Sequence, residues 1–199
     1  MTPRRPVRSY HHGDLKTALK KAALELVREK GPRGFSLNEA SRRAGVTVAA
    51  PYRHFDDKEA LLAEIICDGN AILEEETRRA ANGARTITQK MLEAGVAYLR
   101  FAAEHADYFS VMFHSGIDKS KYPSVQLSAT RAFDVILGLA QQKEATEKLA
   151  RERAVSAWAL AHGLATLRSE GALSETADQE ADLQHLKPIL RRFLDQPYQ

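Results

Sequence analysis

Residues 35–62 read FSLNEASRRAGVTVAAPYRHFDDKEALL, and the spacing of polar caps and apolar residues in this stretch decides the fold. Ser36 with Glu39 three residues later is a capping box, which predicts that a helix of about two turns begins here. Gly45 ends this helix, because glycine adopts a left-handed turn without a steric cost. The stretch therefore begins with a short capped helix and a tight turn.

A second short helix is predicted over residues 48–54, with Thr47 as its cap, and Asp56 with Glu59 predicts the start of a longer one. Ser41 is small where the two short helices must approach most closely. Two short helices across a glycine turn form a helix-turn-helix, whose second helix lies in the major groove of DNA while the first crosses the backbone. An ordinary helical hairpin has the same pattern, so the motif alone leaves both interpretations open.

Basic residues are concentrated at the N-terminal end of this 199-residue chain. The formal net charge is only +3, but Lys and Arg outnumber Asp and Glu by 13 to 8 over residues 1–65 and fall short by 16 to 18 over the rest. A polyanion such as DNA is attracted to the basic end first. Residues 1–12 hold Arg4, Arg5 and Arg8 without an acid, which predicts a flexible basic arm that contacts DNA, or a tail that only aids solubility.

The single cysteine, Cys67, excludes an internal disulfide and favours a reducing compartment. No apolar run reaches the length of a membrane span, and the N-terminal residues lack the hydrophobic segment of a signal peptide. We therefore expect a cytoplasmic protein that does not bind a membrane. His11 and His12 are adjacent, but no other residue near them has metal-ligand spacing, so neither a metal nor another cofactor is expected.

Apolar residues recur at helical spacing along the whole chain. From Leu15 they line one face of an amphipathic helix that ends at Gly31-Pro32 and completes a three-helix unit with the helix-turn-helix. A helix from Asp57 to about Ala80 links this unit to the remainder. Further helices follow, the first capped by Thr86 and the last containing Pro188, which should kink it or delay its start. No strand pattern is found, so an all-α fold of about nine helices is predicted.

Four segments form a dense, ordered string within residues 14–66: Ser36, Ala44-Gly45-Val46-Thr47, Tyr52-Arg53-His54-Phe55 and Lys58-Glu59-Ala60-Leu61-Leu62. This string resembles the TetR family of transcriptional regulators. Beyond it the likeness is architectural, with one local match. Trp158-Ala-Leu-Ala-His162-Gly163 is similar to the C-terminal domain type of this family that is named for a Trp-His-Gly pattern.

The resemblance implies a helix-turn-helix DNA-binding domain over residues 13–66 and a helical effector-binding and dimerisation domain over residues 67–199. It implies a homodimer whose last two long helices form the interface, here Trp158–Ser169 and Leu183–Leu194. Effector binding would shift the linking helix and spoil the spacing of two DNA-reading heads on a palindromic double-stranded operator. The implied function is a repressor released by a small, largely apolar effector. A constitutive or architectural DNA-binding protein without an effector is the alternative.

The resemblance also places ten side chains against DNA. Base-facing positions fall on Asn38, Val48, Ala49, Ala50 and Arg53, and phosphate-facing positions fall on Ser36, Thr47, Tyr52, His54 and Lys58. Arg53 suits guanine and Asn38 suits adenine, whereas the three small apolar residues can meet only thymine methyl groups. Pro51 departs from the family's bulky aliphatic residue and requires the reading helix to start near Val48. Packing within the domain is the alternative for Tyr52 and His54.

Aromatic and thioether side chains in the second part predict an apolar ligand site. The candidates are Met91, Tyr98, His105, Phe109, Met112, Phe113, Phe133, Trp158 and His162, and Phe101 and Tyr108 share their pattern. For any single one of them a place in the hydrophobic core is the stronger interpretation, because such stripes are usually core. Arg131 and His105 would hold a carboxylate or phenol of a ligand, or lie on the surface.

Catalysis is not expected from this sequence. It contains no phosphate-binding loop, no nucleophile elbow, no His-Glu-x-x-His and no cysteine cluster. A helix-turn-helix recombinase would need several carboxylates to hold metal ions, whereas the acidic residues here fall on solvated faces.

Overall fold

The computed structural model describes residues 12–173 and 179–196, and within these residues the chain is built from helices alone. The elements are α1 (His12–Lys30), α2 (Leu37–Arg43), η1 (Pro51–Arg53), α3 (Lys58–Asn82), α4 (Ile87–Glu104), α5 (Ala106–His114), η2 (Lys119–Lys121), α6 (Pro123–Gln141), α7 (Glu147–Ser169) and α8 (Gln179–Asp195), where η denotes a short 3-10 turn. The predicted all-α fold is confirmed, with an N-terminal helix-turn-helix followed by a larger helical part. The proposed arm over residues 1–11 lies outside the described residues.

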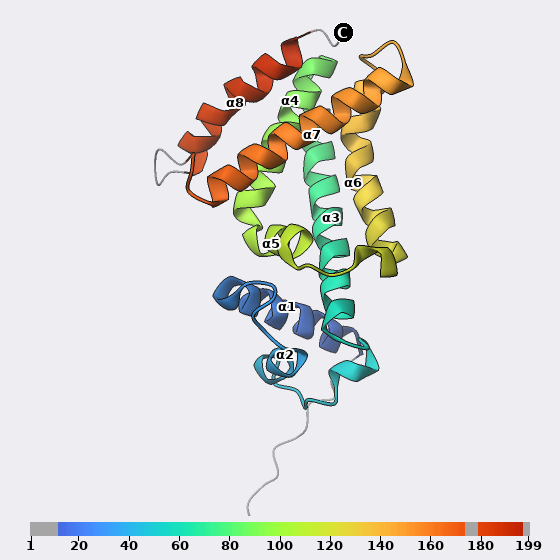
Figure 1. The fold of residues 1–199 in the computed structure, drawn as a ribbon, viewed down its shortest axis with the longest axis vertical. Coiled ribbons are helices and arrows are strands. Elements are labelled where there is room, and N and C mark those ends of the chain that lie inside the picture. The colour runs from blue at the N-terminus through green and yellow to red at the C-terminus, as the bar shows by residue number, and fades with distance from the viewer. Residues whose placement is uncertain (1–11, 174–178, 197–199) are drawn as a thin grey trace, which may run out of the picture.

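A small head, made of α1, α2 and η1, forms the lower end of the molecule in Figure 1. Its core is apolar: Leu19, Phe35 and Phe55 are each at most 5 % exposed. The predicted capping box of α2 is present. The Ser36 hydroxyl oxygen accepts a hydrogen bond from the Glu39 amide at 3.2 Å, and the Glu39 carboxylate accepts one from the Ser36 amide at 2.9 Å.

The turn after α2 has the expected glycine conformation, with Gly45 at φ 72°. Ser41 is fully buried, and its hydroxyl donates to the Leu37 carbonyl oxygen at 2.8 Å, so a polar side chain is accommodated at this close packing point. The Val46 amide then donates to the Ser41 carbonyl oxygen at 3.0 Å and closes the turn. The first half of the helix-turn-helix therefore follows from local caps and small residues.

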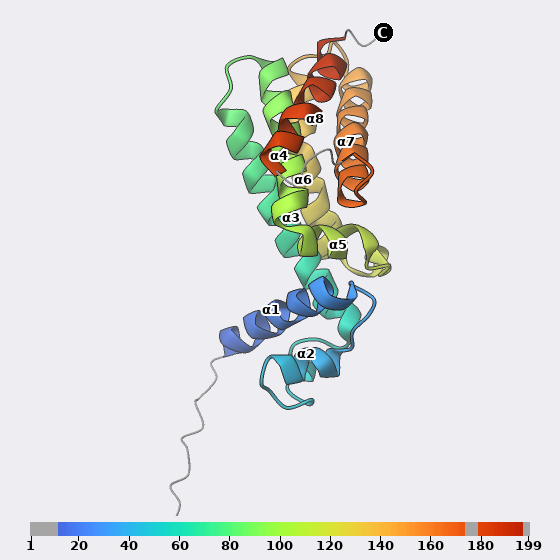
Figure 2. The same cartoon turned by 90° about the vertical axis from the view of Figure 1, so that its left-hand side faces the viewer.

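The linking helix is α3, which runs from the head deep into the larger part (Figures 1 and 2). Asp57 is its N-cap, and the Asp57 carboxylate accepts a hydrogen bond from the Ala60 amide at 2.8 Å. The cap is thus one residue later than Asp56, and the helix ends at Asn82, close to the predicted end. Its first turns are buried in the head, and the rest packs against α4, α5 and α6.

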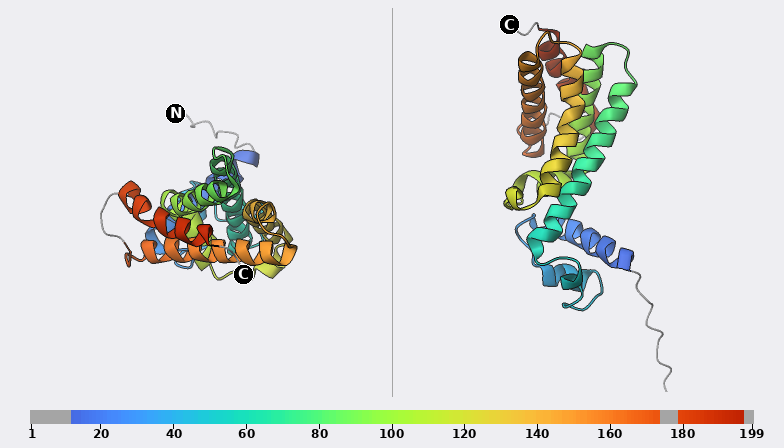
Figure 3. Two further views of the ribbon diagram at one scale, coloured as in Figure 1. Left: turned by 90° about the horizontal axis from the view of Figure 1, so that it is seen from above. Right: turned by 90° about the vertical axis from the view of Figure 1, so that its right-hand side faces the viewer.

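The larger part is organised around α4, which contacts α3, α5, α6, α7 and α8. Thr86 caps α4 as predicted, its hydroxyl oxygen accepting from the Gln89 amide at 3.2 Å. Seen from above, α7 and α8 lie along the outside of the bundle (Figure 3). The inward face of α8 carries four buried leucines: Leu183, Leu186, Leu190 and Leu194. Because α8 begins at Gln179 and continues through Pro188, the proline does not delay its start.

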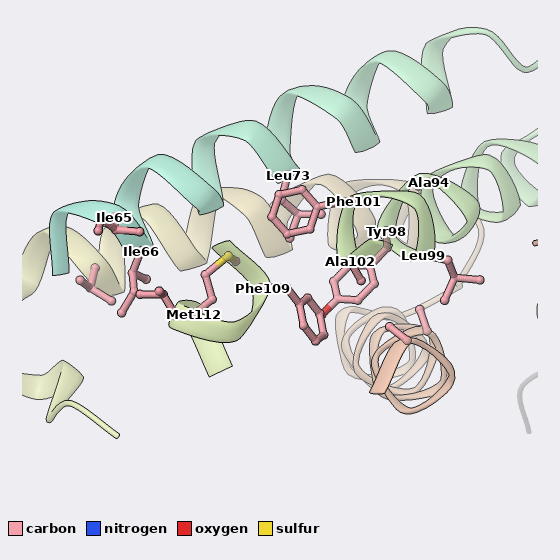
Figure 4. Packing of buried hydrophobic residues seen from close by; sticks show 14 of the residues in the cluster. Ile65, Ile66, Leu73, Ala94, Tyr98, Leu99, Phe101, Ala102, Phe109 and Met112 are labelled. Atoms are coloured by element: carbon pink, nitrogen blue, oxygen red, sulfur yellow. The ribbon is translucent and has the colours of Figure 1, made fainter. Parts of the chain in front are cut away.

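Buried side chains of α3, α4 and α5 pack together in the middle of this bundle. Figure 4 shows Ile66 and Leu73 from α3, Tyr98 and Phe101 from α4, and Phe109 and Met112 from α5 packed together. Most of the space between the helices is filled by such contacts, which leaves the cavity described below as a distinct feature.

Candidate DNA-binding surface and internal cavity

The side chains expected to face DNA gather on the lower surface of the head. Most of them are exposed: Ser36, Asn38, Thr47, Val48, Ala49, Tyr52 and Arg53. Ala50, His54 and Lys58 are half-buried. Val48 and Tyr52 are large side chains that are 47 % and 56 % exposed, so both are accessible to a partner.

The prediction of a reading α-helix over residues 48–54 is wrong, because this segment forms two turns. Thr47 to Ala50 forms a turn closed by an Ala50 amide to Thr47 carbonyl bond of 3.0 Å, and Pro51–Arg53 forms the 3-10 turn η1. Proline has no amide hydrogen, so Pro51 cannot donate to the Thr47 carbonyl as an α-helix requires. The His54 amide instead donates to the Pro51 carbonyl at 2.8 Å. This missing helix accounts for eight α-helices in the described residues where about nine were predicted.

Lys58 is tied to the head rather than extended into solvent. Its Nζ donates to the Arg33 carbonyl oxygen at 3.2 Å and lies 4.3 Å from the centre of the Phe35 ring. Burial lowers the pKa of Lys58, with an opposing influence from Glu39. A lysine in this position holds the loop before α2 to the start of α3, and a phosphate contact would require its side chain to turn outward.

Ion pairs occupy several of the other basic groups of the head. The Arg43 guanidinium binds both oxygens of Glu29, at 2.5 and 2.8 Å, and joins α2 to α1. Lys30 lies 2.7 Å from Glu39 and is the main reason that the pKa of Glu39 falls to about 2. Arg42 is exposed, four residues after Asn38 on the same face of α2, and has no ion pair within the described residues. The sequence-based assignment omitted it, although this spacing from Asn38 was visible.

A cavity of about 430 Å³ lies inside the larger part, between α3, α4, α6 and α7, with α5 and η2 at one end. Five of the nine candidate ligand residues line it: Tyr98, Met112, Phe113, Phe133 and Trp158. The wall also contains residues that the prediction missed, including Ile66, Asn70, Leu73 and Thr77 of α3, Lys119 of η2, and Arg151 of α7. The α3 residues share an ordinary apolar helix pattern, so only their packing distinguishes them.

Four of the predicted ligand residues lie behind the cavity wall. Met91 and Phe109 are core residues with 1 % and 3 % exposure. His105 lies at the end of α4, where its Nε2 is 3.2 Å from Glu76 Oε1. His162 lies behind Tyr98, and Nδ1 of His162 is 2.8 Å from the Tyr98 hydroxyl. The core alternative therefore describes Met91 and Phe109, whereas His105 and His162 are half-buried outside the wall. Arg131, the other candidate for a polar ligand group, is exposed and 3.6 Å from Glu74.

The Tyr98 hydroxyl and the His162 imidazole form a polar pair in a largely aromatic cluster with Phe109 and Phe113. Burial raises the pKa of Tyr98, so the phenol is neutral. Burial also lowers the pKa of His162, and the neighbouring His114 adds to the shift. Tyr98 therefore presents its ring to the cavity while its hydroxyl is held from behind.

The lowered pKa of His162 predicts a pH-dependent stability. In the unfolded chain His162 binds a proton below about pH 6.5, whereas in the folded chain it binds this proton only at a lower pH. The stabilisation is therefore complete above about pH 6.5 and is lost as the pH falls through the lowered pKa. We expect the melting temperature to fall between about pH 7.5 and 5.5, and to fall less in His162→Gln. Thermal denaturation of both proteins checks this, and equal pH dependence in the two would contradict it.

The short helix α5 is held onto the head from both of its ends. Asp107 in its first turn is 6 % exposed, and its Oδ2 lies 2.5 Å from Arg28 Nη2 of α1. At the other end Arg33 Nε donates to the His114 carbonyl oxygen at 3.1 Å. Between these ends α5 supplies part of the cavity wall. It therefore contacts both the head and the cavity.

Two family models match separate parts of the chain. The model described as bacterial regulatory proteins of the tetR family matches residues 19–65, and the model described as the tetracyclin repressor-like C-terminal domain matches residues 91–187. The chain belongs to the TetR family. Its head is thus the family's DNA-binding helix-turn-helix, and the larger part is a C-terminal domain of the same family. The finer likeness to the Trp-His-Gly type stays a prediction.

Solved structures with the TetR fold extend over nearly the whole chain. A protein of unknown function from Rhodococcus sp. RHA1 is 27 % identical, with a TM-score of 0.78 over 96 % of this chain and 100 % of its own. The fatty acid degradation regulator FadR from Bacillus halodurans is 13 % identical, with a TM-score of 0.73 over 94 % and 100 %. A tetR-family regulatory protein from Rhodococcus RHA1 is 14 % identical, with a TM-score of 0.73 over 90 % and 96 %. No curated protein matches the sequence.

TetR-family proteins are transcriptional regulators rather than enzymes; they bind DNA operators and are generally dimeric. Within the part of the chain that the structure describes, no group of His, Cys, Asp and Glu side chains is arranged to hold a metal ion. None of the helices in the same part combines the length and apolar character needed to span a membrane.

Proposed function

We propose that this TetR-family regulator is a homodimeric repressor that leaves its operator when a small, largely apolar molecule fills the cavity. The observation that carries this proposal is the shared position of α3 and α5, which line the cavity and also contact α1 of the head. Helix α5 packs against α1, and α3 is joined to α1 by the Lys16–Glu64 and Lys20–Asp68 ion pairs. A ligand that changes their packing therefore acts on elements that touch the DNA-reading head.

DNA recognition is assigned to the exposed surface around η1. Arg53 pairs with guanine and Asn38 with adenine in the major groove, while Val48, Ala49 and Ala50 meet thymine methyl groups. Ser36, Thr47, Tyr52, His54 and Lys58 contact phosphate and orient the head. Because η1 is a short 3-10 turn, few side chains reach base edges directly. The local shape of the operator therefore contributes to specificity.

The two kinds of contact predict different mutant behaviour. Arg53→Ala is expected to reduce discrimination at one base position by about 1–3 kcal/mol. Lys58→Ala is expected to weaken binding equally on all sequences and to lower the salt dependence by about one charge. Fluorescence anisotropy on operator and random duplexes over a salt series measures both effects. Equal losses on both duplexes for Arg53→Ala would remove Arg53 from the base-reading set.

The homodimer interface is assigned to the outer faces of α7 and α8. Val155, Trp158 and Leu167 of α7 and Ile189 of α8 are large apolar side chains that are 43 %, 41 %, 43 % and 45 % exposed. A second copy of the chain covers them in the proposed dimer. Two heads related by a two-fold axis then read a palindromic operator.

Coupling between the cavity and the head is assigned to α5 and the lower half of α3. Gly69 lets the two helices approach closely, since an added Cβ atom would lie 2.7 Å from Met112 Sδ. Movement of Met112 by a ligand therefore displaces α5 against α3. The Asp107–Arg28 ion pair transmits this displacement to α1, and the two heads of the dimer lose the separation that the operator requires.

The decisive experiment is footprinting of the purified protein on the DNA that flanks its own gene, with and without members of a lipophilic compound panel. A ligand that raises the melting temperature and also releases the DNA supports the proposal. Footprints that persist with every stabilising compound favour a constitutive or architectural DNA-binding protein. Absence of any footprint on duplex DNA contradicts both functions.

A further inference from the structure

One end of the cavity contains the ammonium group of Lys119, an exposed residue whose side chain lines the wall. Lys119 Nζ folds back to donate to the Met112 carbonyl oxygen at 2.6 Å, and it lies 5.6 Å from the centre of the Phe113 ring. Burial lowers the pKa of Lys119. Among the described residues no carboxylate lies within ion-pair distance of it. The adjacent Asp118 is engaged elsewhere, since its carboxylate accepts from the Ser120 hydroxyl at 2.6 Å.

The same wall contains Asn70, whose side-chain oxygen has no hydrogen bond from a described residue. Asn70 is 5 % exposed, and its Nδ2 donates to Ser128 Oγ at 3.0 Å. The Ser128 hydroxyl donates its single hydrogen to the Val125 carbonyl oxygen at 2.9 Å. With its proton on Val125, Ser128 accepts from the Asn70 amide nitrogen. The Asn70 carbonyl oxygen is left on the cavity wall without a hydrogen bond from any described residue.

These two polar groups belong to the end of the cavity next to α5. Ile66 lies beside Met112 in Figure 4, and Asn70 follows one helical turn later on α3. Away from this end the wall is mainly apolar, with Leu73, Phe133 and Ile136. The other charged residues on the wall are Asp134 and Arg151, which are exposed as Lys119 is. The cavity thus combines one anion-binding end, a nearby acceptor and an apolar remainder.

We propose that the effector is an amphipathic carboxylic acid with a hydroxyl group close to its carboxylate. The carboxylate pairs with the Lys119 ammonium, and the hydroxyl donates to the Asn70 carbonyl oxygen. The apolar body fills the space along Leu73 and Phe133. This inference rests on the proposed function, because it names the chemical class of the effector. A neutral apolar ligand would leave the Lys119 charge without a counter-ion and the Asn70 carbonyl oxygen without a donor, and a cation would be repelled by Lys119.

Four probes with the same carbon chain separate these contributions: decanoate, 3-hydroxydecanoate, 1-decanol and decyltrimethylammonium, each below its aggregation concentration. We expect decanoate to bind at least about tenfold more tightly than 1-decanol, as a charge-assisted hydrogen bond implies. The 3-hydroxyl should add a further severalfold, and the quaternary ammonium should not bind. Isothermal titration calorimetry on the full chain measures all four affinities.

Two substitutions assign the effects to the named residues. Lys119→Met keeps an unbranched side chain of similar length but removes the charge, so it should abolish the preference for decanoate over 1-decanol. Lys121→Met is the matched control, because Lys121 is an exposed lysine of the same 3-10 turn that does not line the cavity. Asn70→Ala should remove only the advantage of the 3-hydroxyl group, since Ser128 keeps its bond to Val125.

Equal binding of decanoate and 1-decanol by the unsubstituted protein would overturn the inference, as would an unchanged preference in Lys119→Met. Operator binding is measured on the same preparations. If the protein binds its operator and only neutral compounds release it, the proposed effector class is wrong, whereas the proposed function as a regulator is supported. If carboxylates bind through Lys119 while no duplex DNA is bound, the cavity assignment is supported and the proposed function fails.

Discussion

Replacing Leu167 with glutamate is expected to convert the proposed dimer into monomers and to weaken operator binding by about 100-fold or more. Leu167 lies on the outer side of α7 with 43 % exposure. In the dimer a glutamate there would be buried against an apolar surface without a cation, which strongly disfavours association. A monomer then binds one half-site without the high effective concentration that a linked second head provides.

Sedimentation equilibrium gives the oligomeric state, and fluorescence anisotropy on a palindromic operator gives the affinity. Leu127→Glu is the matched control, because Leu127 is an exposed leucine of α6, with 59 % exposure, outside the proposed interface. This control should remain dimeric and bind normally. A dimeric Leu167→Glu protein with full affinity would show that α7 does not form the interface.

Replacing Arg153 with alanine is expected to lower the free energy of unfolding by about 3–5 kcal/mol. Arg153 on α7 is 1 % exposed and pairs with Glu144, which lies between α6 and α7. Its Nη2 also donates to the Gln196 carbonyl oxygen at 3.1 Å, so it joins α7 to the end of α8. Removal of the guanidinium leaves the Glu144 carboxylate buried without its cation.

For a chain of this size the loss corresponds to a decrease of about 6–20 °C in melting temperature. Lys148→Ala is the control on the same helix, because Lys148 is 84 % exposed and only 3.9 Å from Glu152 in a surface pair. Such a pair contributes about 0–1 kcal/mol. Calorimetry of the two variants compares them directly, and similar melting temperatures would exclude a stabilising role for the Arg153–Glu144 pair.

Helix boundaries could be predicted from the sequence because they depend on neighbouring residues. The caps at Ser36 and Thr86 satisfy amides within three residues, so their effect does not require the rest of the fold. Gly45 likewise meets a local backbone requirement. The error over residues 48–54 has a local cause too. Pro51 was recognised as acceptable in a first turn, but the loss of its donor was enough to replace an α-helix by turns.

The ligand site was predicted less completely, because a stripe of large side chains has the same spacing whether it faces a cavity or a core. Tyr98 and Phe109 follow the same pattern, yet only Tyr98 lines the cavity and Phe109 packs behind it. Asn70 and Lys119 carry no such pattern at all. Both line the same cavity because the fold brings α3 and η2, which are far apart in sequence, to one wall.

The amino-acid sequence by itself determined the all-helical class, most of the helix ends and the helix-turn-helix head, since these follow from caps, glycine turns and periodic apolar faces within short segments. The tertiary structure alone decided which aromatic residues enclose a cavity, which cations and carboxylates pair across helices, and that α5 touches both the cavity and the head. Those properties depend on the relative positions of side chains from distant segments, and no local spacing encodes them.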